Sequence, residues 1–255
     1  MLDWLKRRRI ARTLERRAIP DSLWRLTLAR FPFLTARSAD DTARLREMAT
    51  LFLAEKEFTG TQGFEITDEV AVAIAAQACL PVLELGLAWY DGFKGIVVHA
   101  DLVVARREVM DDDGIVHEFE EELAGEAMHG GPVMLSWVDV IDAGASAELG
   151  YNVVIHEFVH VLDMRNGEAD GVPALPDLAA REAWVGTLQA EYDAFCVRVD
   201  ADEETLLDPY AAEAEEEFFA VAAEAFFVAP REFRAEHPRF YALLSGFFKQ
   251  DPASQ

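Results

Sequence analysis

Residues 153–163, Val-Val-Ile-His-Glu-Phe-Val-His-Val-Leu-Asp, constrain this chain more than any other stretch. They place a His-Glu-x-x-His pattern inside an apolar run, with the histidines at His156 and His160. On an α-helix, side chains four residues apart lie on the same face, so both imidazoles can bind one Zn²⁺. The alternative is a buried helix that carries two histidines by coincidence. Because the chain has only 6 histidines in 255 residues, the pattern favours a metal site.

Glu157 follows the first histidine and is predicted to lie beside the metal. A carboxylate in that place can take a proton from a metal-bound water, which is general-base catalysis. Apolar neighbours on the same helix would bury the site and keep it dry; they are Val153, Val154, Ile155, Val159 and Leu162. We therefore expect Glu157 to be the general base of a hydrolytic site.

A catalytic zinc site usually has three protein ligands, so a third must come from elsewhere. Asp163 lies one turn beyond His160 on the same helix, too far along for tetrahedral closure. We interpret it as an acceptor for a histidine N–H or as a helix-end contact. The acid-rich segment 213–227 offers Glu217 and Glu224, which lie on one helix face. Glu224 lies among apolar residues, where burying an unpaired carboxylate costs free energy. A carboxylate in that position is explained if Glu217 binds zinc and Glu224 accepts a hydrogen bond that orients a ligating histidine. Spacing alone leaves Glu217 equally open to being one more exposed acid.

The composition, with 51% hydrophobic and 27% charged residues, is typical of a folded chain. No stretch reaches the roughly 18 uninterrupted apolar residues of a membrane span. Residues 1–9 are basic but lack the apolar core of a secretory signal behind them. Cys79 and Cys196 each lie among apolar residues, so we expect buried thiols rather than a disulfide framework. A cytoplasmic location is the resulting expectation.

The net charge of −24 is unevenly distributed. Residues 1–46 hold 12 of the 23 lysines and arginines and 5 of the 47 acids, so this segment is +7 and the remainder is −31. The strongly acidic remainder of the chain, after residue 46, argues against direct nucleic-acid binding. The basic segment has three interpretations: it docks on the acidic body, it binds an anionic partner, or it is a solvated helix. Docking or solvation is favoured.

Hydrophobic periodicity, cap residues and prolines predict a largely helical chain with a small sheet. A loop is expected at 58–63. The expected helices are 3–18, 21–31, 38–53, 67–80, 177–199, 214–228 and 230–248. β-Branched residues predict strands at 95–99, 102–104, 115–117 and 133–137. Asp113-Gly114 predicts the turn of a hairpin.

Several separated blocks, in a fixed order along the chain, carry a resemblance to a known family. They are residues 75–83, 131–137, 156–167, 210–212 and 217–221. In these blocks the chain resembles the Mlc titration factor A family of zinc peptidases. The resemblance covers most of the chain and is weakest in residues 1–40.

The resemblance implies a gluzincin with a catalytic core like that of anthrax lethal factor. The implied fold is α+β and zincin-like, mostly helical with a small mixed β-sheet next to the His-Glu-x-x-His helix. It implies a single domain over 1–255, with a basic helical part (1–60), a helix and sheet part (61–145) and the zinc-site helices (146–255).

Carried over residue by residue, the resemblance makes His156, His160 and Glu217 the ligands of one Zn²⁺ per chain. Glu157 becomes the general base. Tyr210 matches a family tyrosine near the metal and would stabilise the oxyanion of the reaction.

The predicted function is zinc-dependent hydrolysis of peptide bonds, aminopeptidase-like by resemblance. Strand 133–137 is either the edge that pairs with an extended peptide or an interior strand. The resemblance also implies a second hypothesis, a protein that binds and sequesters a glucose-responsive repressor of the Mlc type, with peptidase activity secondary. Since His-Glu-x-x-His does not name the substrate, zinc hydrolysis of a non-peptide amide stays open.

Overall fold

The computed structural model describes residues 2–101, 103–110, 116–123, 125–144 and 150–254. Its α-helices are α1 (Leu2–Arg17), α2 (Asp21–Arg30), α3 (Ala39–Glu55), α4 (Asp68–Ala78), α5 (Trp137–Asp142), α6 (Val153–Asp163), α7 (Leu178–Asp200), α8 (Glu215–Val228), α9 (Pro230–Glu236) and α10 (Pro238–Phe248). Its strands are β1 (Glu57–Gly60), β2 (Gly95–His99), β3 (Val103–Met110), β4 (Val116–Leu123), β5 (Gly125–Ala127) and β6 (Val133–Ser136). The predicted α+β class, mostly helical with a small sheet, is confirmed. Among these helices none combines the length and the apolar character that crossing a bilayer requires.

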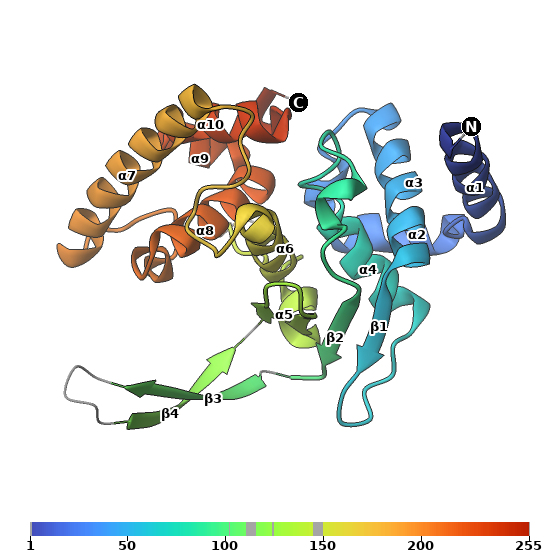
Figure 1. Ribbon diagram of the computed structural model, residues 1–255, viewed down its shortest axis with the longest axis horizontal. Coiled ribbons are helices and arrows are strands. Elements are labelled where there is room, and N and C mark those ends of the chain that lie inside the picture. The colour runs from blue at the N-terminus through green and yellow to red at the C-terminus, as the bar shows by residue number, and fades with distance from the viewer. Residues whose placement is uncertain (1, 102, 111–115, 124, 145–149, 255) are drawn as a thin grey trace.

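Four strands form a mixed sheet in the order β1-β2-β6-β5. Strands β1, β2 and β6 are parallel, whereas β5 runs antiparallel to β6. Strands β3 and β4 form a separate antiparallel pair that extends away from the body of the molecule (Figure 1). The predicted Asp113-Gly114 turn lies outside the described residues. Because β6 has a partner on each side, the strand predicted at 133–137 is an interior strand, and its interpretation as a peptide-pairing edge is wrong. The strand ends at Ser136, since Trp137 begins α5.

Helix α6 lies at the centre of the fold, between the N-terminal helices α1–α4 and the C-terminal helices α7–α10 (Figure 1). Asn152 caps it by accepting a hydrogen bond from the Ile155 backbone N–H at 2.9 Å. The Phe158 ring packs against the rings of Phe52 and Tyr90, with centroids 5.7 and 5.1 Å apart. The cap fixes where the helix begins, and the aromatic contacts fix its rotation, so its polar face is set as well.

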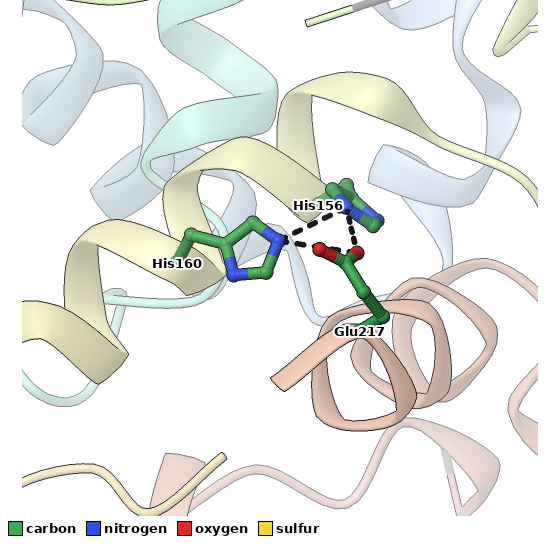
Figure 2. Close-up of side chains that lie close together, drawn as sticks. All are labelled: His156, His160 and Glu217. Carbon is green, nitrogen blue, oxygen red and sulfur yellow. Dashed lines mark hydrogen bonds and ion pairs between the residues drawn. The ribbon is translucent and has the colours of Figure 1, made fainter. Parts of the chain in front are cut away.

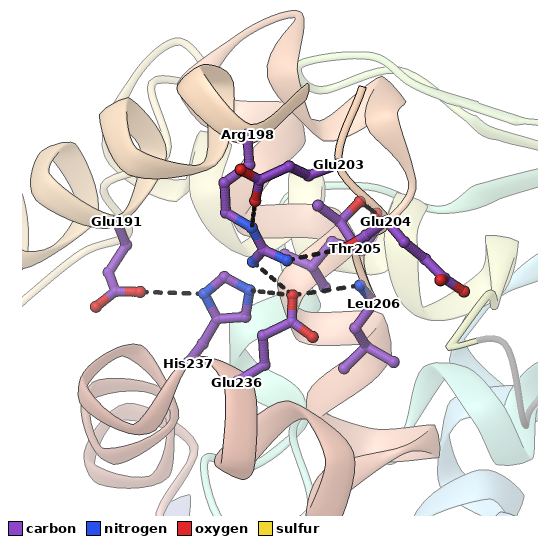
Figure 3. Close-up of polar contacts among 9 residues, drawn as sticks. Glu191, Arg198, Glu203, Glu204, Thr205, Leu206, Glu236 and His237 are labelled. Carbon is purple, nitrogen blue, oxygen red and sulfur yellow. Dashed lines mark hydrogen bonds and ion pairs between the residues drawn. The ribbon is translucent and has the colours of Figure 1, made fainter. Parts of the chain in front are cut away.

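The C-terminal helices are joined by a polar network (Figure 3). The Arg198 guanidinium of α7 donates to Glu236 of α9 at 2.6 Å. His237 Nδ1, which follows α9, lies 3.1 Å from the Glu191 carboxylate of α7. These contacts hold α7 against the α9–α10 pair and leave α8 enclosed between them and α6.

Two local predictions are wrong for identifiable reasons. Residues 58–60 lie in β1 and not in a loop, because the Glu57 N–H donates to the Lys94 carbonyl and the segment then pairs with β2. The helix predicted over 230–248 is divided, because Pro238 has no N–H to continue the ladder and instead begins α10.

The basic helix α1 packs on α3, where Arg9 pairs with Glu55 at 3.1 Å. Docking on the chain's own surface is therefore the interpretation of the basic segment that the contacts support. Both side chains are largely exposed, so the pair itself contributes only about 0–1 kcal/mol.

Gly171 ties the end of α6 to α7 and lies against the start of α8. Its N–H donates to Asp163 Oδ2 at 2.7 Å, and its carbonyl accepts from Trp184 Nε1 at 2.8 Å. Its φ is +73°, and a Cβ there would lie 2.7 Å from the Glu215 carbonyl oxygen. Only glycine satisfies both conditions without strain.

Gly171→Ala is expected to lower the free energy of unfolding by about 1–3 kcal/mol, the usual cost of a non-glycine residue in strained backbone. Urea unfolding followed by circular dichroism measures it. Gly186→Ala is the control, because Gly186 lies in α7 and, apart from the neighbouring backbone of its own helix, no atom lies within 4 Å of its Cβ position. That variant should be neutral or more stable by about 0.5–1 kcal/mol. Equal urea concentrations at the unfolding midpoint for the two variants would contradict the explanation by backbone strain.

Candidate metal centre

Three predicted ligands converge between two helices (Figure 2). His156 and His160 project from α6, and Glu217 projects from the first turn of α8, which packs against α6. The two Nε2 atoms lie 3.1 Å apart. Glu217 Oε2 lies 3.1 Å from His156 Nε2 and 3.4 Å from His160 Nε2. The three potential ligand atoms therefore form a nearly equilateral triangle.

The size of this triangle fits a divalent metal ion. Tetrahedral bonds of about 2.0–2.1 Å place neighbouring ligand atoms about 3.3 Å apart. Glu217 Oε2 is buried and makes no hydrogen bond, although it faces two ring nitrogens. An acceptor in that condition costs free energy unless a cation occupies the position that it faces. Two imidazoles and one carboxylate also form a donor set that suits zinc.

The same contacts shift the pKa values in the metal-free protein. Burial raises the pKa of Glu217, but its pairing with His156 and His160 outweighs this and lowers that pKa well below its ordinary value. Burial lowers the pKa of His156, and the carboxylates of Glu217 and Glu224 outweigh it and raise that pKa. Protons therefore compete with a metal ion for the ring nitrogens, so metal affinity falls as the pH is lowered.

Glu224 supports His156 from behind, as predicted. Its Oε1 lies 2.8 Å from His156 Nδ1, and its other oxygen accepts the backbone N–H of Asn152 at the start of α6. The side chain is almost fully buried. By accepting the Nδ1–H, Glu224 fixes the tautomer of His156 that leaves Nε2 free to bind a metal.

Glu157 lies on α6 beside this triangle and is only 5% exposed. Burial raises its pKa to about 7, against the opposing effect of His156 and His160. Strand β5 covers the carboxylate closely: a Cβ on Gly125 would lie 2.6 Å from Glu157 Oε1. The chain thus provides a buried carboxylate poised to exchange a proton near neutral pH.

Given the role of general base predicted for Glu157, Gly125→Ala is expected to reduce hydrolytic turnover on the order of 10²-fold, the usual effect of misplacing a catalytic group by about 1 Å. The added methyl group would displace the Glu157 side chain and no backbone atom, so the fold and the metal content should survive. Steady-state kinetics and elemental analysis measure the two effects, with Gly186→Ala as the control. Full activity, or loss of metal with the activity, would contradict this role of Gly125.

Tyr210, which the resemblance predicts to lie near the metal, has its ring close to that of His156. It belongs to the short 3-10 helix η5 (Pro209–Ala212) just before α8. Its ring centroid lies 6.2 Å from that of His156, and the residue is 40% exposed. The Tyr210 ring therefore lies near the His156 corner of the triangle and is partly exposed to solvent.

Asp163 takes one of its two predicted roles. Its Oδ2 accepts the Gly171 N–H, which makes it a contact from the helix end to the following loop. Burial raises its pKa to about 7, and the Gly171 N–H opposes that rise. The triangle is formed without it.

Sequence reasoning missed two residues that shape the site. Asn152 caps α6, and its side-chain amide donates to Gln77 Oε1 at 2.8 Å. An Asn directly before an apolar helix is a recognisable cap signal. Gly125 carried no signal, because only the packing of β5 on Glu157 explains it.

Comparisons with known proteins show the family of this chain. The family model described as glucose-regulated metallo-peptidase M90 matches residues 2–249. Mlc titration factor A of Enterobacter sp. (strain 638) is 37% identical over 238 residues, which is 91% of this chain and 88% of that protein. Mlc titration factor A of Salmonella arizonae is 36% identical over 238 residues, which is 92% of this chain and 93% of that protein.

The resemblance seen in the separated sequence blocks is therefore confirmed, and with it the zincin-like α+β fold. The family implies a divalent metal ion, and the triangle of His156, His160 and Glu217 suits one. The chain belongs to the glucose-regulated metallo-peptidase M90 family.

Proposed function

We propose that this chain is a zinc-dependent peptidase in which His156, His160 and Glu217 hold one Zn²⁺. The observation that carries the proposal is the triangle of 3.1, 3.1 and 3.4 Å between their ligand atoms, with a buried carboxylate beside it. Three protein ligands leave a fourth position open, which is the arrangement of catalytic rather than structural zinc sites.

Each residue of the site has a proposed role in peptide hydrolysis. When bound, zinc polarises the peptide carbonyl and lowers the pKa of water. Glu157 takes the proton of the attacking water and passes it to the leaving amine. Tyr210 donates a hydrogen bond to the oxygen that gains negative charge at the attacked carbonyl. Glu224 keeps His156 in its ligating tautomer.

Strand β5 provides a place for an extended peptide. It pairs with β6 on one side, and it is the last strand of the sheet among the residues that the structure describes. A Cβ on Gly125 would lie 2.6 Å from Glu157 Oε1, so a peptide that pairs with β5 would run close to this carboxylate. Main-chain hydrogen bonds to the strand would hold the substrate extended, as in β-strand addition.

The decisive experiment is removal and return of the metal. Zinc-loaded protein should cleave a mixed peptide library, stop after chelation, and recover when one equivalent of Zn²⁺ is restored. Mass spectrometry of the products distinguishes aminopeptidase-like removal of N-terminal residues from internal cleavage. Zinc-loaded protein that cleaves no peptide would refute the proposal, and a panel of small amides would then test the non-peptide alternative.

A second proposed role is binding to a repressor of the Mlc type in the cytoplasm. It is supported by the names of the relatives, which are Mlc titration factor A proteins. Repressor binding by both the wild-type protein and a Glu157→Gln variant would separate this role from peptide hydrolysis. If neither the wild-type protein nor the variant bound the repressor, this role would be refuted.

A further inference from the structure

A series of hydrogen bonds connects helix α4 to the metal site through three buried polar residues. They are Gln77 of α4, Asn152 at the start of α6 and Glu224 of α8. Gln77 and Asn152 are fully buried, and Glu224 is 1% exposed. Burying such groups costs free energy, whereas apolar side chains of similar size would fill the same space without that cost. The presence of these three residues therefore needs an explanation beyond packing.

Each amide in this series can face only one way. Gln77 Nε2 donates to the Ala73 carbonyl of its own helix at 3.1 Å, so Gln77 presents its oxygen to Asn152. Asn152 Nδ2 donates to that oxygen at 2.8 Å, and Asn152 Oδ1 accepts the Ile155 N–H at 2.9 Å. Reversing either amide would bring two carbonyl oxygens together on one side and two N–H groups on the other. The backbone of α4 thus determines the direction of both amides.

The two amides hold the backbone that leads into α6. The Asn152 side chain is anchored on α4 and on the first turn of α6, and its backbone N–H donates to Glu224 Oε2. Gly150, two residues earlier, has a φ of +81°, and a Cβ there would lie 3.5 Å from that of Ala225. The segment therefore lies against α8 beside Glu224. A shift of the Asn152 backbone would move its N–H relative to the carboxylate.

Glu224 passes this constraint to a predicted metal ligand. One of its oxygens accepts the Asn152 N–H, and the other lies 2.8 Å from His156 Nδ1. A carboxylate held at one oxygen has a fixed plane, so the imidazole that donates to its other oxygen is held in one orientation and one tautomer. A buried polar network in which every hydrogen bond is made is rigid, which suits this purpose.

We propose that Gln77 and Asn152 are positioning residues for the metal ion, which hold Glu224 and, through it, the His156 ring in the ligating orientation. The inference rests on the proposed function, in which His156 is one of three Zn²⁺ ligands. The triangle of ligand atoms is formed without either residue. A side chain of α4 thereby helps to set the affinity of a metal site built on α6 and α8.

Gln77→Met tests the series of hydrogen bonds at its far end. Methionine keeps the length and flexibility of the side chain, but its thioether is only a weak acceptor for the Asn152 amide. Zinc affinity should fall by about 10-fold, the lower end of the usual effect of losing a contact behind a metal ligand. Competition with a chromophoric chelator measures this affinity without any substrate. The visible spectrum of the cobalt-loaded protein should also change, because it reports the geometry of the ligands.

Gln250→Met is the matched control. Gln250 is also buried, and its Nε2 donates to the Leu80 carbonyl, just after α4, at 2.9 Å. The same substitution there removes a buried hydrogen bond of the same kind, outside the series that ends at His156. Both variants should be less stable to urea than the wild-type protein. Only Gln77→Met should change the zinc affinity and the cobalt spectrum.

Asn152→Ser separates positioning of the ligand from capping of α6. Serine caps a helix about as well as asparagine, but its side chain is too short to reach Gln77. This variant should weaken zinc binding at least as much as Gln77→Met does. The double variant should bind zinc no more weakly than Asn152→Ser alone, because both changes break the same link.

Two results would overturn the positioning role: wild-type zinc affinity in both Gln77→Met and Asn152→Ser, or equal losses of affinity in Gln77→Met and Gln250→Met. The proposed function fails in a different way. Zinc-dependent peptide cleavage with unchanged affinity in Gln77→Met refutes the positioning role and leaves the peptidase intact. Weakened zinc binding in Gln77→Met, with no peptide cleaved by zinc-loaded wild type, refutes the peptidase and leaves the positioning role.

Discussion

Replacing Glu157 by glutamine is expected to lower peptide turnover by about 10²-fold or more while one metal ion per chain stays bound. The amide keeps the size of the side chain and its fit under Gly125, but it cannot take a proton from water. The ligand atoms of His156, His160 and Glu217 are untouched, so the metal content should not change. Initial rates with a cleaved library peptide and elemental analysis measure the two quantities on the same sample.

The pH dependence of the rate gives this variant a second signature. Glu157 must be ionised to act as a base, so kcat/KM should rise with pH through the pKa of its carboxyl. Burial raises that pKa to about 7 in the metal-free protein, and a bound dication lowers it. The midpoint of the rise in kcat/KM should therefore lie at or below pH 7. The variant should lack this rising limb.

The control for the charge change is Glu168→Gln, in an exposed loop after α6. It should keep both the rate and the pH profile. Full turnover by Glu157→Gln would remove the base from the proposed mechanism, and loss of metal would show that Glu157 supports the ligands instead.

The helix with the two histidines was predictable because its signals are local. An apolar run over α6 and the His-x-x-x-His spacing determine a buried helix with two imidazoles on one face. Glu224 could be singled out because a carboxylate among Ala, Val and Phe needs a partner, and the structure supplies His156 Nδ1 and the Asn152 N–H. The choice of Glu217 as a ligand needed the family resemblance, because helical spacing does not distinguish it from the other glutamates in the first turn of α8.

The parts that escaped prediction depend on contacts between distant segments. Strand β1 has only four residues and forms by pairing with β2, more than thirty residues away in the sequence. Strand β5 has three residues and a glycine at the point where it meets Glu157. Neither has a hydrophobic alternation long enough to be recognised. The surroundings of Glu157 were therefore the least predictable part of the site.

Replacing Glu217 by alanine should produce the largest change in metal binding. The variant removes one corner of the triangle and leaves two imidazoles from a single helix, which cannot close a tetrahedral site. Loss of a supporting contact typically weakens metal affinity by about 10–100-fold, so loss of a ligand should exceed about 100-fold. Zinc content after dialysis against a competing chelator should fall from one per chain towards zero, and peptide cleavage should fall with it.

Two neighbouring acids on α8 make this result interpretable. Glu216→Ala removes a carboxylate from the same helical turn that is not part of the triangle, and it should keep its zinc. Glu224→Ala removes the contact behind His156 and should lie between the two, with affinity weakened by about 10–100-fold. Zinc content that is unchanged in Glu217→Ala but lost in Glu224→Ala would move the third ligand two turns along α8. Because Glu224 Oε1 lies 2.8 Å from Nδ1 rather than Nε2 of His156, that outcome would also require the imidazole to turn over.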